Sequence, residues 1–406
     1  MIEPHSLTDA ELDSIRHLIP DPEPALGRPS PTDGEPAPEQ PLRVSEPLLD
    51  GNEAAYVAEC VSAGWISSAG AFVRRFEDEF AAAVGCQHGV ACSSGTAALH
   101  LALGAAGIGP GDEVVIPTFT MIATANVVRL LGADPVLVDS EPDTGNLDPA
   151  LVAARLGPRT KAIVPVHIYG HPAEVDPLRE IADAAGAALI EDAAEAHGAT
   201  YRGRPAGSLG DAAAFSFYAN KVISTGEGGM VTTDDPALAA RARELRDHAF
   251  SAERHFWHRS VAFNYRMGNL QAAVGVAQTE RLSELVEARR RNARRYSAAL
   301  GEIPGIGVPG ERPDVRSVFW MYAITIGDQF GVSRDELRRR LAARGIETRT
   351  FFVPIHLQPA YFHRHRGERY PVAEELGRTG LYLPSGPGLG EAEIDYVVRE
   401  LARARG

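Results

Sequence analysis

Between residues 88 and 235, short apolar runs alternate with longer segments in which apolar positions recur with helical periodicity. The runs are rich in valine, isoleucine and alanine, which is typical of buried strands, and the segments between them are typical of helices packed on a sheet. The predicted strands are 89–93, 113–117, 134–139, 161–167 and 187–193, and the predicted helices are 96–107, 123–132 and 177–186. This alternation predicts an α/β domain with a largely parallel sheet covered on both faces. Ligands of such sheets bind at the carboxyl ends of strands, so functional residues are expected there.

After residue 235 the pattern becomes mainly helical. A long helix over 270–300 is predicted to lead into a smaller α+β unit. That unit contains a predicted strand at 318–326 and predicted helices at 335–345 and 391–404. The chain therefore divides into a large domain and a small one.

The amino-terminal segment differs from both domains. Residues 7–19 predict a short helix with Thr8 as its N-cap, and residues 21–41 are dense in proline and small polar residues, which is typical of a linker or extended arm. We interpret this extension as a flexible leader, with a regulatory role as the alternative. The expected organisation is an extension or linker over 1–41, a large domain over 42–270, a connecting helix over 271–304 and a small C-terminal domain over 305–406.

Composition narrows the class of protein. The 406 residues include 40 lysines and arginines against 54 aspartates and glutamates, which gives a formal net charge of −14. So acidic a chain is poorly suited to neutralising nucleic-acid phosphates over a broad surface, and no segment has the roughly 20 apolar residues that span a membrane. Three cysteines without metal-ligand spacing indicate a reducing compartment, and the polar start lacks the apolar core of a signal peptide. We expect a soluble cytoplasmic protein that binds neither nucleic acid nor membrane.

One lysine, Lys221, stands in an unusual setting. It lies in FSFYANKVISTGEGGMVTTDD (215–235), between an aromatic-rich run and a glycine-rich turn that leads into another β-prone run. Such a lysine is either a surface residue at the end of a strand or a reactive amine in a cofactor pocket, and this stretch alone leaves both interpretations open. The part GEGGMV lacks the full spacing of a dinucleotide loop and leads into a strand, which argues against a nicotinamide site.

Two strand ends carry further candidates. In SSGTAALHLAL, Gly95 and Thr96 open a helix, where N–H groups and the helix dipole favour a phosphate; a plain helix N-cap is the alternative. In LIEDAAEAHGA, the acids Glu191, Asp192 and Glu195 end a strand, where a buried carboxylate requires a cationic partner. These acids either cap the next helix or include one that pairs with a protonated ring nitrogen of a ligand.

The candidates have a specific meaning when they are taken together. Pyridoxal phosphate requires a phosphate site, an acid against its pyridine nitrogen and a lysine that forms a Schiff base. The chain offers a residue type for each of these, in Gly95 and Thr96, the strand-end acids and Lys221. The histidine pairs 167/171, 255/258 and 363/365 show no convincing ligand pattern, so we expect no metal.

With these residues in view, the sequence resembles the sugar aminotransferases of the DegT/DnrJ/EryC1/StrS family, within the fold type I pyridoxal phosphate enzymes. The resemblance covers about residues 42–400 and rests on motifs in a shared order: VSEPLLDGNE, GWISSAG, SSGTAALHLAL, PTFTMIATAN, PVHIYGHP, EDAAEAHGA, FSFYANKVISTGEGGMV, FNYRMGNLQAA, PIHLQPAY and LPSGPGL. It implies an aspartate aminotransferase-like fold, with a large cofactor-binding domain and a smaller C-terminal α+β domain. The sequences of these motifs are most similar to those of the perosamine synthase branch, which aminates a GDP-linked 4-keto-6-deoxyhexose.

The resemblance also implies a role for each matching residue. Lys221 would form the Schiff base with pyridoxal 5′-phosphate, and Asp192 would pair with its pyridinium nitrogen. The residues expected at the cofactor phosphate are Gly95, Thr96, Ser216 and, from a neighbouring subunit, Asn264. The residues expected to face the sugar nucleotide are Ser67 and Ser68 in GWISSAG and His356 in PIHLQPAY. The family therefore implies an obligate homodimer with shared sites.

Two positions depart from the common family pattern. Met121 stands where many members have an aromatic residue stacked on the cofactor ring; a thioether can still pack on a ring face, worth about 0.3–1.5 kcal/mol. Glu195 stands near the cofactor's phenolic oxygen, where many relatives have glutamine, although glutamate also occurs in the perosamine branch. A carboxylate there would repel a phenolate unless it keeps a proton or turns away.

The implied reaction is a ping-pong transamination. L-Glutamate would donate its amino group to the cofactor, leaving pyridoxamine 5′-phosphate, which would then aminate a nucleotide-linked keto-deoxysugar, with Lys221 as general acid and base. The alternatives are amination of a keto-cyclitol and dehydration of a sugar. The related dehydrases have histidine in place of the lysine, so Lys221 favours transfer.

Overall fold

The computed structural model describes residues 6–31, 35–251, 253–254 and 256–405. Its largest element is a sheet of seven strands in the order β1-β9-β8-β5-β4-β2-β3. The strands are β1 (His88–Cys92), β2 (Glu113–Pro117), β3 (Asp134–Val138), β4 (Thr160–Ile163), β5 (Ala188–Asp192), β8 (Ala212–Ser216) and β9 (Gly229–Thr233). Strand β9 is antiparallel to β1 and β8, and the other neighbours are parallel. The predicted α/β fold class is confirmed.

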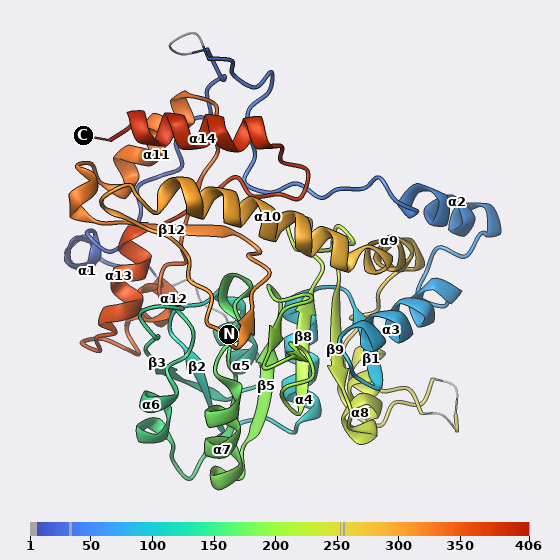
Figure 1. Cartoon of the computed structure of the whole chain (residues 1–406). Helices are drawn as coiled ribbons and strands as arrows, with labels where there is room; N and C mark the ends of the chain where they lie inside the picture. Colours follow the sequence, from blue (N-terminus) through green and yellow to red (C-terminus); the bar gives the residue numbers. More distant parts are fainter. Residues whose placement is uncertain (1–5, 32–34, 252, 255, 406) are drawn as a thin grey trace.

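Helices cover this sheet (Figure 1). The helices of this domain are α2 (Glu53–Ala63), α3 (Ala71–Ala83), α4 (Gly95–Ala105), α5 (Ala123–Leu130), α6 (Pro149–Val152), α7 (Val175–Ala185), α8 (Pro236–Arg246) and α9 (Asn269–Glu280). Of these, α2 packs on α9 and lies to one side of the sheet in Figure 1. Helix α4 is buried along most of its length, from Ala97 to Leu103, because it packs against β8 and β9 on one side and α5 and α8 on the other. Its amino end is thereby fixed close to the ends of the central strands.

The small domain has its own antiparallel sheet, in the order β10-β12-β14-β13. Its strands are β10 (Ile306–Gly307), β12 (Tyr322–Ile326), β13 (Arg349–Thr350) and β14 (Gly380–Leu383), and its helices are α11 (Arg334–Ala343), α12 (Pro359–Phe362), α13 (Pro371–Thr379) and α14 (Glu391–Arg403). Helix α10 (Leu282–Leu300) runs between the large sheet and α14 in Figure 1. A further short sheet joins β11 (Val315–Arg316) to β6 (Thr200–Tyr201) and β7 (Arg204–Pro205).

Two predicted elements differ from the observed ones. The helix predicted over 270–300 is broken at Arg281, whose φ of −110° ends α9 and precedes α10. The strand predicted over 318–326 begins only at Tyr322, because the preceding residues bond to the large domain. The Val318 N–H donates to Gly170 O (3.0 Å) and the Trp320 N–H to Tyr169 O (2.9 Å). The small domain therefore inserts residues 318–321 beside the large sheet.

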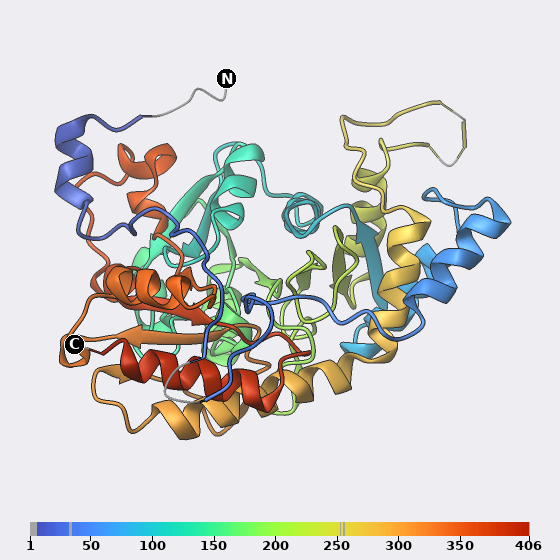
Figure 2. The same ribbon diagram turned by 90° about the horizontal axis from the view of Figure 1, so that it is seen from above.

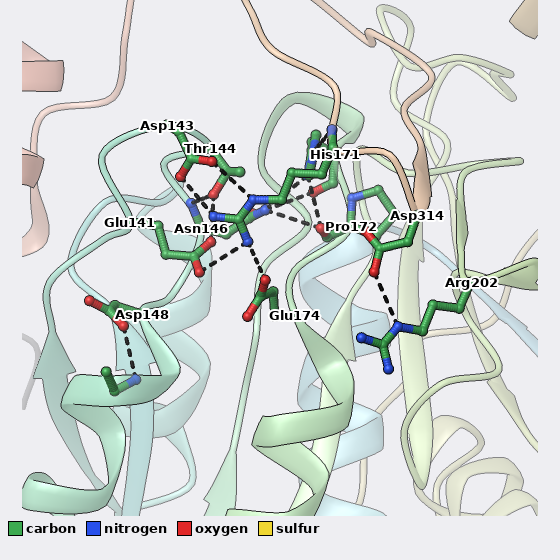
Figure 3. Close-up of polar contacts among 12 residues, drawn as sticks. Glu141, Asp143, Thr144, Asn146, Asp148, His171, Pro172, Glu174, Arg202 and Asp314 are labelled. Atoms are coloured by element: carbon green, nitrogen blue, oxygen red, sulfur yellow. Dashed lines mark hydrogen bonds and ion pairs between the residues drawn. The ribbon is translucent and has the colours of Figure 1, made fainter.

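Polar contacts fasten the segment before these residues to the large domain. Arg312 donates to both carboxylate oxygens of Asp143 (2.9 and 2.8 Å), to Glu174 (2.6 Å) and to Glu141 (3.2 Å). Figure 3 shows the three acids turned toward this guanidinium, with the Arg202–Asp314 ion pair alongside. A bidentate pair of this kind fixes orientation as well as distance. These contacts fix the segment that leads into residues 318–321 on the large domain.

The amino-terminal extension is not a flexible leader in the described residues. Helix α1 (Asp9–Ile15) has a capping box between Thr8 and Glu11, and its apolar side packs Ile15 against Leu357 and Phe362. Figure 2 shows the extension running from α1 along the small domain toward α2.

Hydrogen bonds and ion pairs hold the extension there. The Gly27 N–H donates to Ala342 O (2.8 Å), and Glu23 pairs with Arg338 (2.7 Å), which is 1% exposed. The composition of 21–41 predicted a linker or extended arm, and its described residues form no helix. Composition could not predict that the arm docks, because its partners are far away in the sequence.

Candidate active site

A cavity of about 400 Å³ lies where strands of the large sheet end and residues of the small domain approach. Its lining includes most of the predicted cofactor residues: Gly95, Thr96, Met121, Asp192, Glu195, Ser216 and Lys221. The lining also includes Thr120, Tyr218, Asn220, Trp320 and Phe352, to which the sequence motifs assigned no role. Residues separated by more than a hundred positions thus meet at the expected edge of the sheet.

One end of the cavity is formed by the start of α4. The Ser94 side chain caps the helix by accepting from the Ala97 N–H (3.1 Å), and Gly95 and Thr96 are its first residues, whose N–H groups have no acceptor within the helix. A Cβ on Gly95 would lie 2.5 Å from the Ser216 Cβ. Glycine is therefore required for the close approach of α4 to β8. The site has the N–H groups, the hydroxyl and the helix polarity that a phosphate requires.

Adjacent acids at the end of β5 have opposite roles. Glu191 is fully buried and accepts from the Gly207, Leu209 and Gly210 N–H groups, so its carboxylate fastens a neighbouring loop. Asp192, with its side chain on the other face, lines the cavity and accepts from the Thr124 hydroxyl (2.9 Å). This alternation of faces follows from strand geometry.

Asp192 meets the requirement for pairing with a ring nitrogen. Burial raises the pKa of Asp192, and the hydrogen bonds from Thr124 and Ala194 oppose that rise. Among the residues that the structure describes, no cationic side chain forms an ion pair with Asp192. A protonated ring nitrogen would supply the missing positive charge, so this residue fits a pyridinium.

Lys221 and Glu195 lie next to one another in the cavity lining. The Lys221 Nζ lies 3.8 Å from the Glu195 Oε1, and both side chains are largely buried. Burial lowers the pKa of Lys221, and it raises the pKa of Glu195 to about 7 while the charge of Lys221 opposes that rise. Glu195 therefore keeps its proton up to near neutrality, which allows it to lie beside a phenolic oxygen.

The backbone holds Glu195 in this position. Its Oε2 accepts from the Tyr169 N–H (2.7 Å). Tyr169 has a φ of 53°, a left-handed conformation that is uncommon for a residue with a side chain. In this conformation the Tyr169 N–H donates to Glu195 and fixes its carboxyl group.

Met121 lies at the mouth of the cavity, where it is 51% exposed. Besides Tyr218 of the large domain, the aromatic residues of the lining come from the small domain, in Trp320 and Phe352. Sequence reasoning missed both, because Trp320 lies in an apolar run that predicted an ordinary strand and Phe352 has no distinctive motif around it.

Ser67, Ser68 and Asn264 lie outside the cavity lining of the single chain. The two serines are on the loop between α2 and α3, which Asn269 holds by accepting from the Phe72 N–H (3.0 Å) and donating to Trp65 O (2.6 Å). Asn264 is exposed and accepts from the Arg266 Nε (3.0 Å). None of the three contacts the residues of the cavity in these polar interactions.

His356 also lies outside the cavity lining of the single chain. It was expected to face the sugar nucleotide, but its ring is 3% exposed and does not line the cavity. PIHLQPAY folds into a short 3₁₀ turn, Ile355–Leu357, which places Nδ1 at 2.9 Å from the Thr118 hydroxyl and Nε2 at 3.4 Å from Glu374. Burial lowers the pKa of His356 to about 4. The ring is thus held against Thr118, the residue that follows β2.

Within the described ranges, no group of three histidine, cysteine or acidic residues is arranged to hold a metal ion. None of the helices in the described part of the chain combines the length and apolar character needed to cross a bilayer.

A helix amino end, an unpaired strand-end acid and a buried lysine on one cavity fit pyridoxal phosphate, and with this fold they define a fold type I aminotransferase. The model of the DegT/DnrJ/EryC1/StrS aminotransferase family matches residues 47–402, and the chain belongs to this family.

Among curated proteins, the GDP-perosamine synthase of Caulobacter vibrioides is 49% identical over 89% of this chain and 97% of its own length. That of Vibrio cholerae is 40% identical over 88% and 97%.

Solved structures agree with this assignment. Streptomyces venezuelae DesV is 41% identical, with a TM-score of 0.82 over 87% of this chain and 94% of its own. The putative sugar aminotransferase Spr1654 from Streptococcus pneumoniae, solved in PMP and PLP forms, is 27% identical; its PLP form has a TM-score of 0.83 over 90% and 98% of the two chains. The chain is a pyridoxal phosphate-dependent sugar aminotransferase that resembles the GDP-perosamine synthases.

Proposed function

We propose that this enzyme transfers the amino group of L-glutamate to the C4 ketone of a GDP-linked 4-keto-6-deoxyhexose. The observation that carries the proposal is the similarity to proteins named GDP-perosamine synthase in three organisms, at 39–49% identity over 88–89% of this chain. The cavity supports it, because the residues that aminotransfer requires converge there.

The residues present would hold the cofactor at three points. Gly95, Thr96 and Ser216 would bind its phosphate, Asp192 its ring nitrogen, and Lys221 its aldehyde carbon covalently. Pyridoxal phosphate supplies an electron sink that allows an amino group and a proton to be moved. Burial lowers the pKa of Lys221, so a larger fraction of the amine can accept a proton at neutral pH than in water. The raised pKa of Glu195 allows a proton to be held at Oε1, close to this amine.

We further propose a homodimer in which Asn264, Ser67 and Ser68 complete the partner's site. These residues lie on segments with exposed apolar side chains: Trp65 (59% exposed), Trp257 (59%), Phe256 (73%) and Val261 (95%). Large exposed apolar side chains gathered on neighbouring segments mark interaction surfaces. The described cysteines are free and buried, which is compatible with a reducing compartment such as the cytoplasm.

A substrate panel tests this function. The purified enzyme is incubated with L-glutamate and one keto-sugar at a time, linked to GDP, dTDP or UDP, and with a keto-cyclitol. Release of 2-oxoglutarate and the product mass are then measured. The GDP-linked 4-keto-6-deoxyhexose is expected to give the fastest release and a 4-amino sugar. A product that has lost a hydroxyl without consuming glutamate would identify a dehydrase, and faster amination of the cyclitol would replace the proposed substrate.

A further inference from the structure

The indole ring of Trp320 lies directly against the amine of Lys221. The Lys221 Nζ is 3.7 Å from the ring centroid, and Trp320 is 4% exposed while its ring forms part of the cavity wall. An aromatic face attracts a cation and has no comparable attraction for a neutral amine, and the attraction grows when both groups are shielded from water. Trp320 therefore distinguishes between the two protonation states of Lys221.

Three hydrogen bonds fix the position of this ring. The Trp320 Nε1 donates to Asn220 O (2.8 Å), its backbone N–H donates to Tyr169 O (2.9 Å), and its carbonyl accepts from the Arg289 Nη1 (2.8 Å). The acceptor Asn220 precedes Lys221 in the chain, so the ring is anchored to the same turn that carries the lysine. The two backbone bonds fix the residue, and the indole face cannot rotate away from the amine without loss of the Nε1–Asn220 bond.

Arg289 donates hydrogen bonds to the backbone of both Trp320 and Lys221. It belongs to α10, is 1% exposed and also donates to Lys221 O (3.2 Å) and to the Ser45 hydroxyl (3.1 Å). Its hydrogen bonds in the described residues are to uncharged oxygens, and burial lowers its pKa to about 10. One guanidinium thus holds the backbone carbonyls of both Trp320 and Lys221, and it links the large and small domains at this point.

The charged groups around the amine act in opposite directions. Glu195 and Asp192, the latter the last residue of β5, favour the ammonium form of Lys221, whereas burial and the charge of Arg289 favour the neutral amine. The ring is uncharged, so it can stabilise the ammonium form without forming a salt bridge that would fix the side chain. A weak interaction with an aromatic face suits an amine that has to move away from the ring and come back to it.

We propose that Trp320 is a positioning residue for Lys221, whose indole face receives the ammonium form of the side chain whenever the amine is not bonded to the cofactor. Arg289 keeps the ring and the lysine backbone in register during that interval. The inference rests on the proposed function, in which Lys221 is released in each cycle and has to return its proton.

The lysine content of the chain permits a direct test. Lys161 and Lys221 are its two lysines, and Lys161 is exposed on β4. The cofactor-free full chain, with ¹³C and ¹⁵N in its lysines, is titrated by NMR as wild type, Trp320→Leu and Trp320→Phe, with the Lys161 signal as internal reference. We expect the pKa of Lys221 to fall by about one unit in Trp320→Leu and to stay near the wild-type value in Trp320→Phe, which keeps a ring face. An identical titration of Lys221 in wild type and Trp320→Leu would overturn the inference.

A fluorescence measurement on the unaltered ring covers the case in which Trp320→Leu does not fold. Trp65 and Trp257 are each 59% exposed, so the short-wavelength part of the emission reports Trp320. This emission should change with the titration of Lys221 in wild type and stay constant in Lys221→Met. Wild-type emission that does not change as Lys221 titrates would contradict the proposal.

The covalent adduct with pyridoxal phosphate, trapped with borohydride and identified by mass, tests the function separately. Failure to form it removes the proposed function. A normal adduct, together with a Lys221 titration that does not respond to Trp320→Leu, removes only the positioning role.

Discussion

Replacing Glu195 with glutamine should stabilise the folded chain relative to wild type. This gain in the free energy of unfolding should be larger in alkaline than in acid solution. The raised pKa means that the folded state holds a proton that the unfolded state releases above its ordinary value of 4.5. Below that value both states are protonated and Glu195 has no effect; between about 4.5 and 7 the unfolded chain ionises while the folded chain keeps the proton, so wild-type stability falls with rising pH and levels off above about 7.

The size of the effect follows from the same pKa values. One pKa unit corresponds to 1.36 kcal/mol, so a rise from 4.5 to about 7 amounts to about 3 kcal/mol at high pH, of which slightly less than 1 kcal/mol is already present at pH 5. Glu195→Gln keeps the shape and the acceptor for the Tyr169 N–H but cannot ionise. The variant should therefore gain about 2 to 3 kcal/mol over wild type between pH 5 and pH 8.

Urea unfolding of the cofactor-free protein at pH 5 and pH 8, at one protein concentration and with refolding verified, measures this difference. Glu302→Gln, the same change at an exposed position, serves as the control and should show no pH-dependent gain. Equal differences between Glu195→Gln and wild type at both pH values would refute the assignment of a raised pKa to Glu195.

Further predictions concern the cofactor and the extension. Lys221→Ala should bind pyridoxal phosphate without a borohydride-reducible bond and should lose turnover; normal turnover would refute its role. Gly95→Ala should weaken pyridoxal phosphate binding more than tenfold in equilibrium dialysis, because the added Cβ would lie 2.5 Å from the Ser216 Cβ, a conflict worth more than about 1.4 kcal/mol. Gly109→Ala, where a Cβ meets nothing within 4 Å, should bind normally. Removal of residues 1–36 should uncover Leu357, Phe362 and Arg338 and lower the melting temperature by about 5 °C; an unchanged melting temperature would show that the extension contributes nothing to stability.

The large domain could be predicted from sequence because its strands are continuous apolar runs and its helices are amphipathic or apolar throughout. The strand ends pointed to Gly95 and to a group of three acids, whereas the choice of Asp192 and the role of Lys221 came from the family resemblance; Gly95, Asp192 and Lys221 all line one cavity. The docking of the extension could not be predicted in this way. Its partners, such as Arg338 for Glu23 and Ala342 for Gly27, are separated from it by more than three hundred residues and share no periodic pattern with it.

His356 and Trp320 show what limits motif reasoning about a site. A motif fixes which residue types occur near one another along the chain, but the direction of a side chain depends on backbone geometry that distant hydrogen bonds decide. His356 lies in a recognisable motif, yet a 3₁₀ turn directs its ring to Thr118 and Glu374. Trp320 lies in an unremarkable apolar run, yet bonds to Tyr169, Asn220 and Arg289 hold its ring on the lysine. Because those three partners come from separate parts of the chain, the contact with the lysine is a property of the assembled domains, and loss of the Arg289 guanidinium should loosen it even with Trp320 and Lys221 unchanged.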